Sequence, residues 1–222
     1  MSGSFFVTGT DTGVGKTLVS AALLHALRRR GLRAAGMKPV AAGCVTVEGR
    51  WHNEDVAALR AAGNVEAPLA ETNPYLFHEA IAPHIAAARH GVTIDIDLLV
   101  ARFRALSARA DAVVVEGAGG FLVPLGDRDT FADLATRLAL PVVLVVGLRL
   151  GCINHALLTR DAVLQRGLTL AGWVANRIDP AMEAAGDNLE TLGQRLQAPL
   201  LADIPFLTSP DAGRVKIDLP GT

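Results

Sequence analysis

The chain has 222 residues, of which 50% are apolar, and its formal net charge at pH 7 is -1. This length is enough for one domain with a sizeable core, and no linker-like stretch divides it, so we expect residues 1–222 to form a single domain. The near-neutral charge excludes the basic surface typical of proteins that bind nucleic acid or anionic membranes, so we expect a small-molecule partner.

The chain begins with a predicted strand, a glycine-rich loop and a predicted helix. The apolar run Phe5–Thr8 indicates the strand, and apolar residues recur at helical spacing between Lys16 and Arg30. Residues 9–17, between them, read Gly-Thr-Asp-Thr-Gly-Val-Gly-Lys-Thr. A glycine-rich loop in this setting is typical of a phosphate-binding P-loop, in which backbone N–H groups, a lysine and a hydroxyl hold phosphates and Mg²⁺.

The loop therefore predicts a nucleotide site in which Lys16 reaches the terminal phosphates and Thr17 binds Mg²⁺. Five residues separate Gly9 from Gly15, where the usual motif has four. A glycine-rich turn that binds no nucleotide is the alternative. Only three of the 21 basic residues are lysines, and a lysine retained against that bias suggests a site that needs a compact ammonium group.

Lys38 is a second retained lysine, in the sequence Met-Lys-Pro-Val at the end of the next apolar run. At the end of a parallel strand it would share an edge with the P-loop and could hold an anion that the ATP phosphate must meet. The alternative is a surface lysine. Asp55 is a metal-ligand candidate with Glu54 as its competitor, but it follows Asn53, a typical helix N-cap, and acidic residues are common in a first helical turn without any function.

The segment 41–91 is less regular and richer in turn residues, with breaks at Asn73–Tyr75 and Ala82–His84. We expect it to place helices and a loop over the carboxyl ends of the strands, where ligands of open α/β sheets bind.

Further apolar runs at 112–115, 142–146 and 171–175 alternate with helical patterns, one of them from about Ile153 to Arg166. Short β-rich runs that alternate with helices predict a mostly parallel sheet covered by helices on both faces. The fold class predicted for the chain is therefore α/β, as a single P-loop NTPase-like domain.

Two polar residues follow these runs. Glu116 comes at the end of a buried run and before glycines that let a ligand approach the backbone, which suits a Mg²⁺ ligand. A glutamate that caps a turn is the alternative. Asn176 opens Asn-Arg-Ile-Asp, which is similar to the base-reading Asn-Lys-x-Asp motif of GTPases, so we expect Asn176 to meet a nucleobase, with a helix N-cap as the alternative.

The remaining composition favours a cytoplasmic protein. No signal peptide is visible, and the apolar run Leu140–Leu148 is too short to span a bilayer. Cys44 and Cys152 are too few for the disulfide framework of a small secreted domain.

Five segments, taken in order, resemble the successive motifs of the dethiobiotin synthetase family: residues 9–17, 38–40, 115–120, 150–155 and 172–176. Each is weak alone, whereas all five in register are very specific. The resemblance implies a cytoplasmic, ATP-dependent cyclo-ligase of biotin biosynthesis that converts 7,8-diaminononanoate, CO₂ or bicarbonate and MgATP into dethiobiotin, ADP and phosphate. It also implies a homodimer with active sites at the subunit interface.

The resemblance further implies roles for individual residues. Lys38 and Lys16 are the expected catalytic residues, and Thr17, Asp55 and Glu116 are the expected Mg²⁺ ligands. The expected ATP-binding residues are Gly13, Val14, Gly15, Lys16, Thr17, Leu18, Asp55, Glu116, Gly117, Ala118, Gly119, Asn176, Arg177, Pro205, Phe206 and Leu207. The expected substrate-binding residues are Thr12, Lys38, Ala42, Gly151, Cys152, Ile153 and Asn154, the last reaching across the dimer.

Three positions depart from the family pattern. Ala42 replaces a frequent substrate-contacting serine, Gly13 replaces a glutamate of some members, and Asn188 lies where some members place a tyrosine. These departures bear on substrate affinity more than on reaction type.

Other P-loop proteins are the competing hypotheses. Amidoligase-like enzymes normally carry a glutaminase domain for which this chain has no room, and partition-type ATPases carry an extra lysine where this chain has Thr8–Thr10. A nucleotide-binding switch is the third hypothesis, which depends on the GTPase-like segment 176–179.

Overall fold

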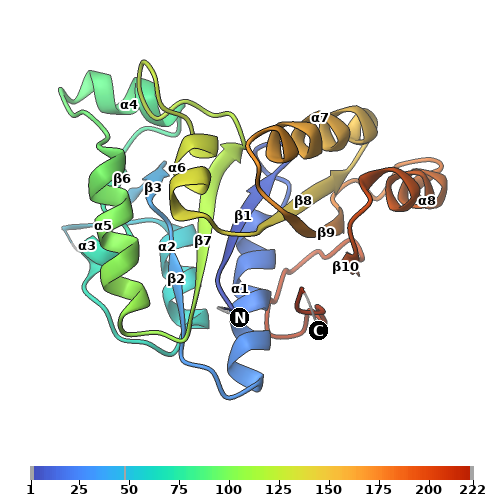
Figure 1. Cartoon of the computed structure of the whole chain (residues 1–222), viewed down its shortest axis with the longest axis horizontal. Coiled ribbons are helices and arrows are strands. Elements are labelled where there is room, and N and C mark those ends of the chain that lie inside the picture. The colour runs from blue at the N-terminus through green and yellow to red at the C-terminus, as the bar shows by residue number, and fades with distance from the viewer. Residues whose placement is uncertain (1–2, 48, 221–222) are drawn as a thin grey trace.

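A six-stranded sheet forms the centre of the computed structural model, which describes residues 3–47 and 49–220. Its order is β2 (Ala34–Met37), β7 (Ala112–Gly120), β1 (Phe5–Gly9), β8 (Val142–Leu148), β9 (Leu170–Arg177) and β10 (Leu200–Ile204). Figure 1 shows this sheet from β2 on the left to β10 on the right. Its strand pairings are parallel, so the carboxyl ends of the strands meet at one edge.

Helices cover both faces because alternate residues of each strand point to opposite sides. Along β7, Val113 and Val115 pack into one core layer, and Ala112 and Val114 pack into the other. The first layer contains α5 (Ile96–Ser107), α6 (Phe131–Leu138), α7 (Cys152–Gln165) and α8 (Ala185–Leu196). The second contains α1 (Lys16–Arg29), α2 (Glu54–Ala62) and apolar residues of the C-terminal segment.

Short elements between β2 and α5 form the least regular part of the fold. β3 (Val40–Ala42) pairs in parallel with β6 (Tyr75–Phe77), and β4 (Val45–Val47) pairs antiparallel with β5 (Arg50–His52). The helices α3 (Leu69–Thr72) and α4 (Pro83–Arg89) complete this part, with α4 at the upper left of Figure 1. The predicted break at 82–84 is the start of α4, where Ala82 is the N-cap.

The predicted α/β fold class is confirmed, and strands extend beyond the predicted apolar runs, among them β7 and β9. Glu116 lies inside β7, opposite Val7 of β1, rather than at a strand tip. Asn176 lies inside β9, opposite Ile204 of β10. In both places a neighbouring parallel strand extends equally far, and its pairing carries the strand past the last apolar residue. Within the described part of the chain, no helix is long and apolar enough to cross a membrane.

Candidate functional site

A cavity of about 640 Å³ opens at the carboxyl edge of the sheet. It is lined by the loop and first turn between β1 and α1, by residues of β7 and of the segment just after it, by residues of the segment from the end of β2 to the first turn of α2, and by the segment before α4. These residues are Thr12, Gly13, Gly15, Lys16, Thr17, Lys38, Ala42, Asp55, Ala80, Ile81, Ala82, Pro83, Glu116, Ala118, Gly119 and Val123. The predicted phosphate loop and the predicted metal ligands therefore share one cavity.

The phosphate loop has the conformation that its glycines allow. Gly13 and Gly15 have φ angles of 73° and 91°, in the left-handed region that favours glycine. A Cβ atom on Gly15 would lie 2.2 Å from Nδ2 of Asn176. That nitrogen donates a hydrogen bond of 2.9 Å to the carbonyl oxygen of Val14. Asn176 thus buttresses the loop from β9, a contact that the motif comparison did not predict.

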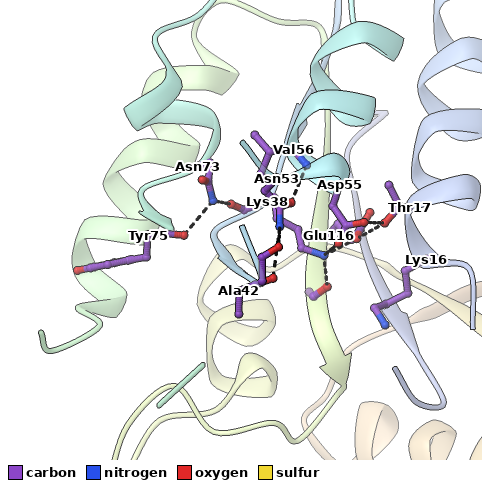
Figure 2. A network of polar contacts seen from close by, with 12 residues as sticks. Lys16, Thr17, Lys38, Ala42, Asn53, Asp55, Val56, Asn73, Tyr75 and Glu116 are labelled. Carbon is purple, nitrogen blue, oxygen red and sulfur yellow. Dashed lines mark hydrogen bonds and ion pairs between the residues drawn. The ribbon is translucent and has the colours of Figure 1, made fainter. Parts of the chain in front are cut away.

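Lys38 is the centre of a partly buried ionic cluster (Figure 2). Its Nζ lies 2.5 Å from Oε1 of Glu116 and 2.9 Å from Oδ2 of Asp55. The hydroxyl of Thr17 lies 2.7 Å from Oδ1 of Asp55 and 2.9 Å from Oε1 of Glu116. The cluster joins β7, the first turn of α2 and the first turn of α1. Asp55, and not the exposed Glu54, is the carboxylate that reaches it.

Backbone contacts hold Lys38 and Asp55 in place. The N–H group of Lys38 donates to the carbonyl oxygen of Thr72 at 2.8 Å, and Nδ2 of Asn73 donates to the carbonyl oxygen of Lys38 at 2.7 Å. Asn53 caps α2 by accepting from the N–H group of Val56, as the sequence predicted, and this fixes the turn that carries Asp55. The role of Asn73 was missed, and its only sequence signal was the break before Pro74.

The two lysines of the cavity have opposite electrostatic environments. Burial alone would lower the pKa of Lys38, but the Glu116 and Asp55 carboxylates outweigh this effect and raise it. Burial would raise the pKa of Asp55, but Lys38 and the Thr17 hydroxyl lower it. The pKa of Lys16 is lowered to about 8, first by burial and then by the charge of Lys38. Lys16 donates to the carbonyl oxygen of Asp11 at 3.0 Å.

The side chains around Thr17 fit a magnesium ion that arrives with a phosphate. Glu116 is fully buried, and its Oε2 has no hydrogen-bond partner among the described residues. No group of three or more His, Cys, Asp or Glu in the described ranges could hold a metal by itself. Magnesium commonly uses one or two carboxylates, with waters and substrate phosphates as the other ligands, so Thr17, Asp55 and Glu116 are a sufficient set.

The expected base-binding residues lie beside a second cavity of about 470 Å³ after β10. Pro205 and Leu207 line it, and Phe206 is 44% exposed. The guanidinium of Arg177 forms two hydrogen bonds, of 2.9 and 2.8 Å, with Asp203, which also lines this cavity. The side chain of Leu18, another expected ATP-binding residue, packs against the second core layer.

The four expected substrate residues Gly151–Asn154 form the start of α7, away from the main cavity as its described lining defines it. Gly151 and Asn154 are exposed, Cys152 is buried, and the preceding Leu150 is 94% exposed. Sγ of Cys152 lies 3.9 Å from Oδ1 of Asn188 in α8. A single chain therefore does not bring these four residues to the lysines and carboxylates.

Comparisons with known proteins agree with the geometry. A family model described as an AAA domain matches residues 3–213. The chain is 57% identical, over 220 residues, to the ATP-dependent dethiobiotin synthetase BioD of Aromatoleum aromaticum, and the match covers 98% of each chain. The chain belongs to the dethiobiotin synthetase family. The resemblance seen in the five sequence segments is thereby confirmed over nearly the full length of this family member.

More distant solved structures share the fold alone. A ParA family ATPase from Chlorobium tepidum superposes with a TM-score of 0.54 and 13% identity over 92% of this chain and 85% of the other. The signal recognition particle 54 kDa protein from Aeropyrum pernix, in complex with GDP, gives a TM-score of 0.50 and 18% identity over 98% of this chain and 44% of the other. Both comparisons show that the chain shares its fold with these two proteins.

Proposed function

We propose that this protein closes the ureido ring of dethiobiotin from 7,8-diaminononanoate, CO₂ and MgATP. The observation that supports this proposal most strongly is that one cavity is lined by two lysines and by the three expected Mg²⁺ ligands, namely Lys16, Lys38, Thr17, Asp55 and Glu116. Family membership supplies the reaction, because the relative from Aromatoleum aromaticum is an ATP-dependent dethiobiotin synthetase. The cavity supplies a cradle of cations and carboxylates suited to a transferring phosphoryl group.

Each part of the phosphate site has a role in this proposal. The N–H groups of the loop and the N-terminus of α1 bind the phosphates, and Lys16 turns from the Asp11 carbonyl to the terminal phosphates. Thr17, Asp55 and Glu116 would hold Mg²⁺, which would neutralise charge on the triphosphate. The base is placed between Asn176 and the second cavity, where Pro205 and Leu207 supply apolar surface.

The substrate site continues from the same cavity. Thr12 and Ala42 line the path between the phosphate loop and Lys38. A substrate amine adds CO₂ and loses a proton to give a carbamate. The carbamate oxygen attacks the γ-phosphate and ADP leaves. The second amine then attacks the carbonyl carbon of the mixed anhydride and phosphate leaves, which closes the ring.

Lys38 stabilises the meeting point of carbamate and γ-phosphate through its charge. Its raised pKa keeps the ammonium protonated, so it acts as a fixed cation rather than as a base. No protein nucleophile is needed, because positioning of both amines and electrostatic stabilisation can supply the acceleration.

The active unit is proposed to be a cytoplasmic homodimer of single-domain chains. The start of α7 does not reach the cavity of its own chain, whereas in a dimer Asn154 and its neighbours can complete the partner's cavity. The exposed Leu150 beside them, and Leu158, which is 61% exposed on α7, give that surface an apolar character.

Phosphate release from MgATP tests the proposal. We expect release to depend on diaminononanoate together with bicarbonate, and dethiobiotin to appear in equal amount by mass spectrometry. Lys16→Gln should abolish both while the protein stays folded, with a melting temperature no lower than the parent's. Slow hydrolysis that ignores diaminononanoate would instead favour the nucleotide-switch hypothesis and reject the synthetase.

A further inference from the structure

An ion pair connects the phosphate loop to the start of α7. A guanidinium nitrogen of Arg149, which directly follows β8, contacts Oδ2 of Asp11, which follows β1. The two strands are neighbours in the sheet, so the pair closes the gap between their carboxyl ends. Neither residue was among the expected site residues.

Asp11 uses three separate atoms to organise the phosphate loop. Its Oδ1 accepts a hydrogen bond of 2.7 Å from the N–H group of Thr12, and its Oδ2 contacts Arg149. Its carbonyl oxygen accepts from Nζ of Lys16 at 3.0 Å. The orientation of the Asp11 carboxylate therefore governs the backbone of the loop tip, and that backbone in turn governs the resting position of Lys16.

Arg149 ties the same contact to α7. Its carbonyl oxygen accepts a hydrogen bond of 3.0 Å from the N–H group of Cys152, the first residue of α7. Gly151, with a φ of 93°, lets the chain turn sharply between them. A movement of the Arg149 side chain and backbone therefore shifts the first turn of α7.

The charge of Asp11 explains why such a partner is needed. A carboxylate beside a triphosphate repels it, and an exposed carboxylate is free to turn toward the loop. Arg149 neutralises this charge and holds the Asp11 carboxylate on the side of β8. The N–H group of Thr10 donates a hydrogen bond of 3.0 Å to the carbonyl oxygen of Val145, which anchors the base of the loop. The ion pair with Arg149 holds the tip of the loop.

We propose that Asp11 and Arg149 form a positioning pair that holds the phosphate loop in its binding conformation and couples it to the first turn of α7. Nucleotide binding in one cavity then orders the turn that receives the carboxylate of the amine substrate, and the two ligands bind cooperatively. The coupling to the substrate rests on the proposed function, whereas the effect on the nucleotide does not.

Calorimetry on the full-length protein with Mg²⁺ and a non-hydrolysable ATP analogue tests the pair. The variants are Arg149→Met, Asp11→Asn, their double mutant and Arg149→Lys. The matched control is Arg33→Met, which breaks an ion pair with Asp111 that is also surface-exposed but lies before β2 and β7, at the opposite edge of the sheet. Each titration is repeated with saturating diaminononanoate, and melting temperatures report folding.

We expect Arg149→Met and Asp11→Asn each to weaken analogue binding by about threefold to tenfold, the range of an ion pair of at most moderate strength. The double mutant should lose little more than either single variant, because both remove one interaction. Arg149→Lys should recover most of the affinity, since the contact uses a single guanidinium nitrogen. The affinity gain produced by diaminononanoate should fall toward one in both Arg149→Met and Asp11→Asn and stay unchanged in Arg33→Met.

Exposed ion pairs often contribute nothing measurable to stability. A pair that contributes nothing measurable to nucleotide binding would refute the proposal. If Arg149→Met and Asp11→Asn keep the parent's analogue affinity and the parent's diaminononanoate effect, the pair positions nothing. If losses in the two single variants add fully, the residues act separately and the pair is equally rejected. Failure of the synthetase reaction in the parent protein would be seen in phosphate release and would leave the analogue titrations as a valid test of the loop.

Discussion

Nucleotide binding should draw a proton from solution at alkaline pH, because the free protein holds Lys16 with its pKa lowered to about 8. Phosphate oxygens placed beside the ammonium favour its charged form and raise the pKa again. From the titration of a group of pKa about 8, the deprotonated fraction of Lys16 is about one tenth near pH 7 and about three quarters near pH 8.5. Proton uptake on binding should follow these fractions.

The assay is calorimetric titration of a non-hydrolysable ATP analogue with Mg²⁺ in two buffers of different ionisation enthalpy. The difference in observed heat gives the number of protons taken up, and the phosphates contribute little because they are already ionised above about pH 7. Lys16→Arg is the matched control, since a guanidinium does not titrate in this range. Equal uptake at both pH values, or the same uptake in Lys16→Arg, would refute the assigned environment of Lys16.

The sign of the stability effect follows from the same pKa. The folded, nucleotide-free protein binds fewer protons at Lys16 than the unfolded chain between about 8 and the unperturbed value of 10.5. Its free energy of unfolding should therefore rise with pH across that window, relative to Lys16→Met. The full shift corresponds to about 3 kcal/mol, so Lys16→Met should melt later than the parent near neutral pH.

Three further predictions concern Lys38, Gly15 and Leu150. Lys38→Ala should lose turnover by about 10²-fold or more while keeping most of its nucleotide affinity, and Lys38→Arg should recover little; full activity in Lys38→Arg would contradict the fixed-cation role. Gly15→Ala should weaken nucleotide binding, because residue 15 has a left-handed φ and the added Cβ would overlap with Asn176. A second change to Ala at Asn176 should relieve the overlap but not the backbone strain. Normal nucleotide binding by Gly15→Ala would contradict both the overlap and the strain. Leu150→Asp should give monomers in analytical ultracentrifugation with an unchanged melting temperature. Leu69→Asp, at an exposed leucine on α3, is the control and should leave the oligomeric state unchanged. Dimers of Leu150→Asp would exclude Leu150 from the interface.

The sequence predicted the positions of the glycine-rich loop and of Lys38, because both directly follow apolar runs. Lys38 follows β2 as predicted, and a helix does begin after Asn53. The order of the strands in the sheet could not be predicted, because the same apolar runs are compatible with several parallel strand orders. The contact between Lys38 and Glu116, 78 residues apart, exists because β7 lies next to β2.

Contacts that depend on the final packing were missed for the same reason. Asp11 and Arg149 are separated by 138 residues and meet because β1 and β8 are neighbours. Asn176 was expected to meet the base through its similarity to a known motif, and this stays a prediction. The hydrogen bond from its side-chain amide to the Val14 carbonyl is an additional contact that the motif did not indicate. A motif identifies a residue type and its strand, whereas its hydrogen-bond partner depends on the element that packs beside it.

The two lysines show how one cavity can separate binding from chemistry. Lys38 and Lys16 are both buried, yet the pKa of the first is raised and that of the second is lowered. The difference arises because Glu116 and Asp55 contact Lys38 directly, whereas Lys16 is buried near the charge of Lys38 and donates to a neutral carbonyl group. Lys16 therefore has an unsatisfied charge that phosphate can satisfy, which favours its use in nucleotide binding. Lys38 already has its counter-ions in Asp55 and Glu116. This agrees with the proposal that the charge of Lys38 acts mainly on the negative charge that would develop between carbamate and γ-phosphate.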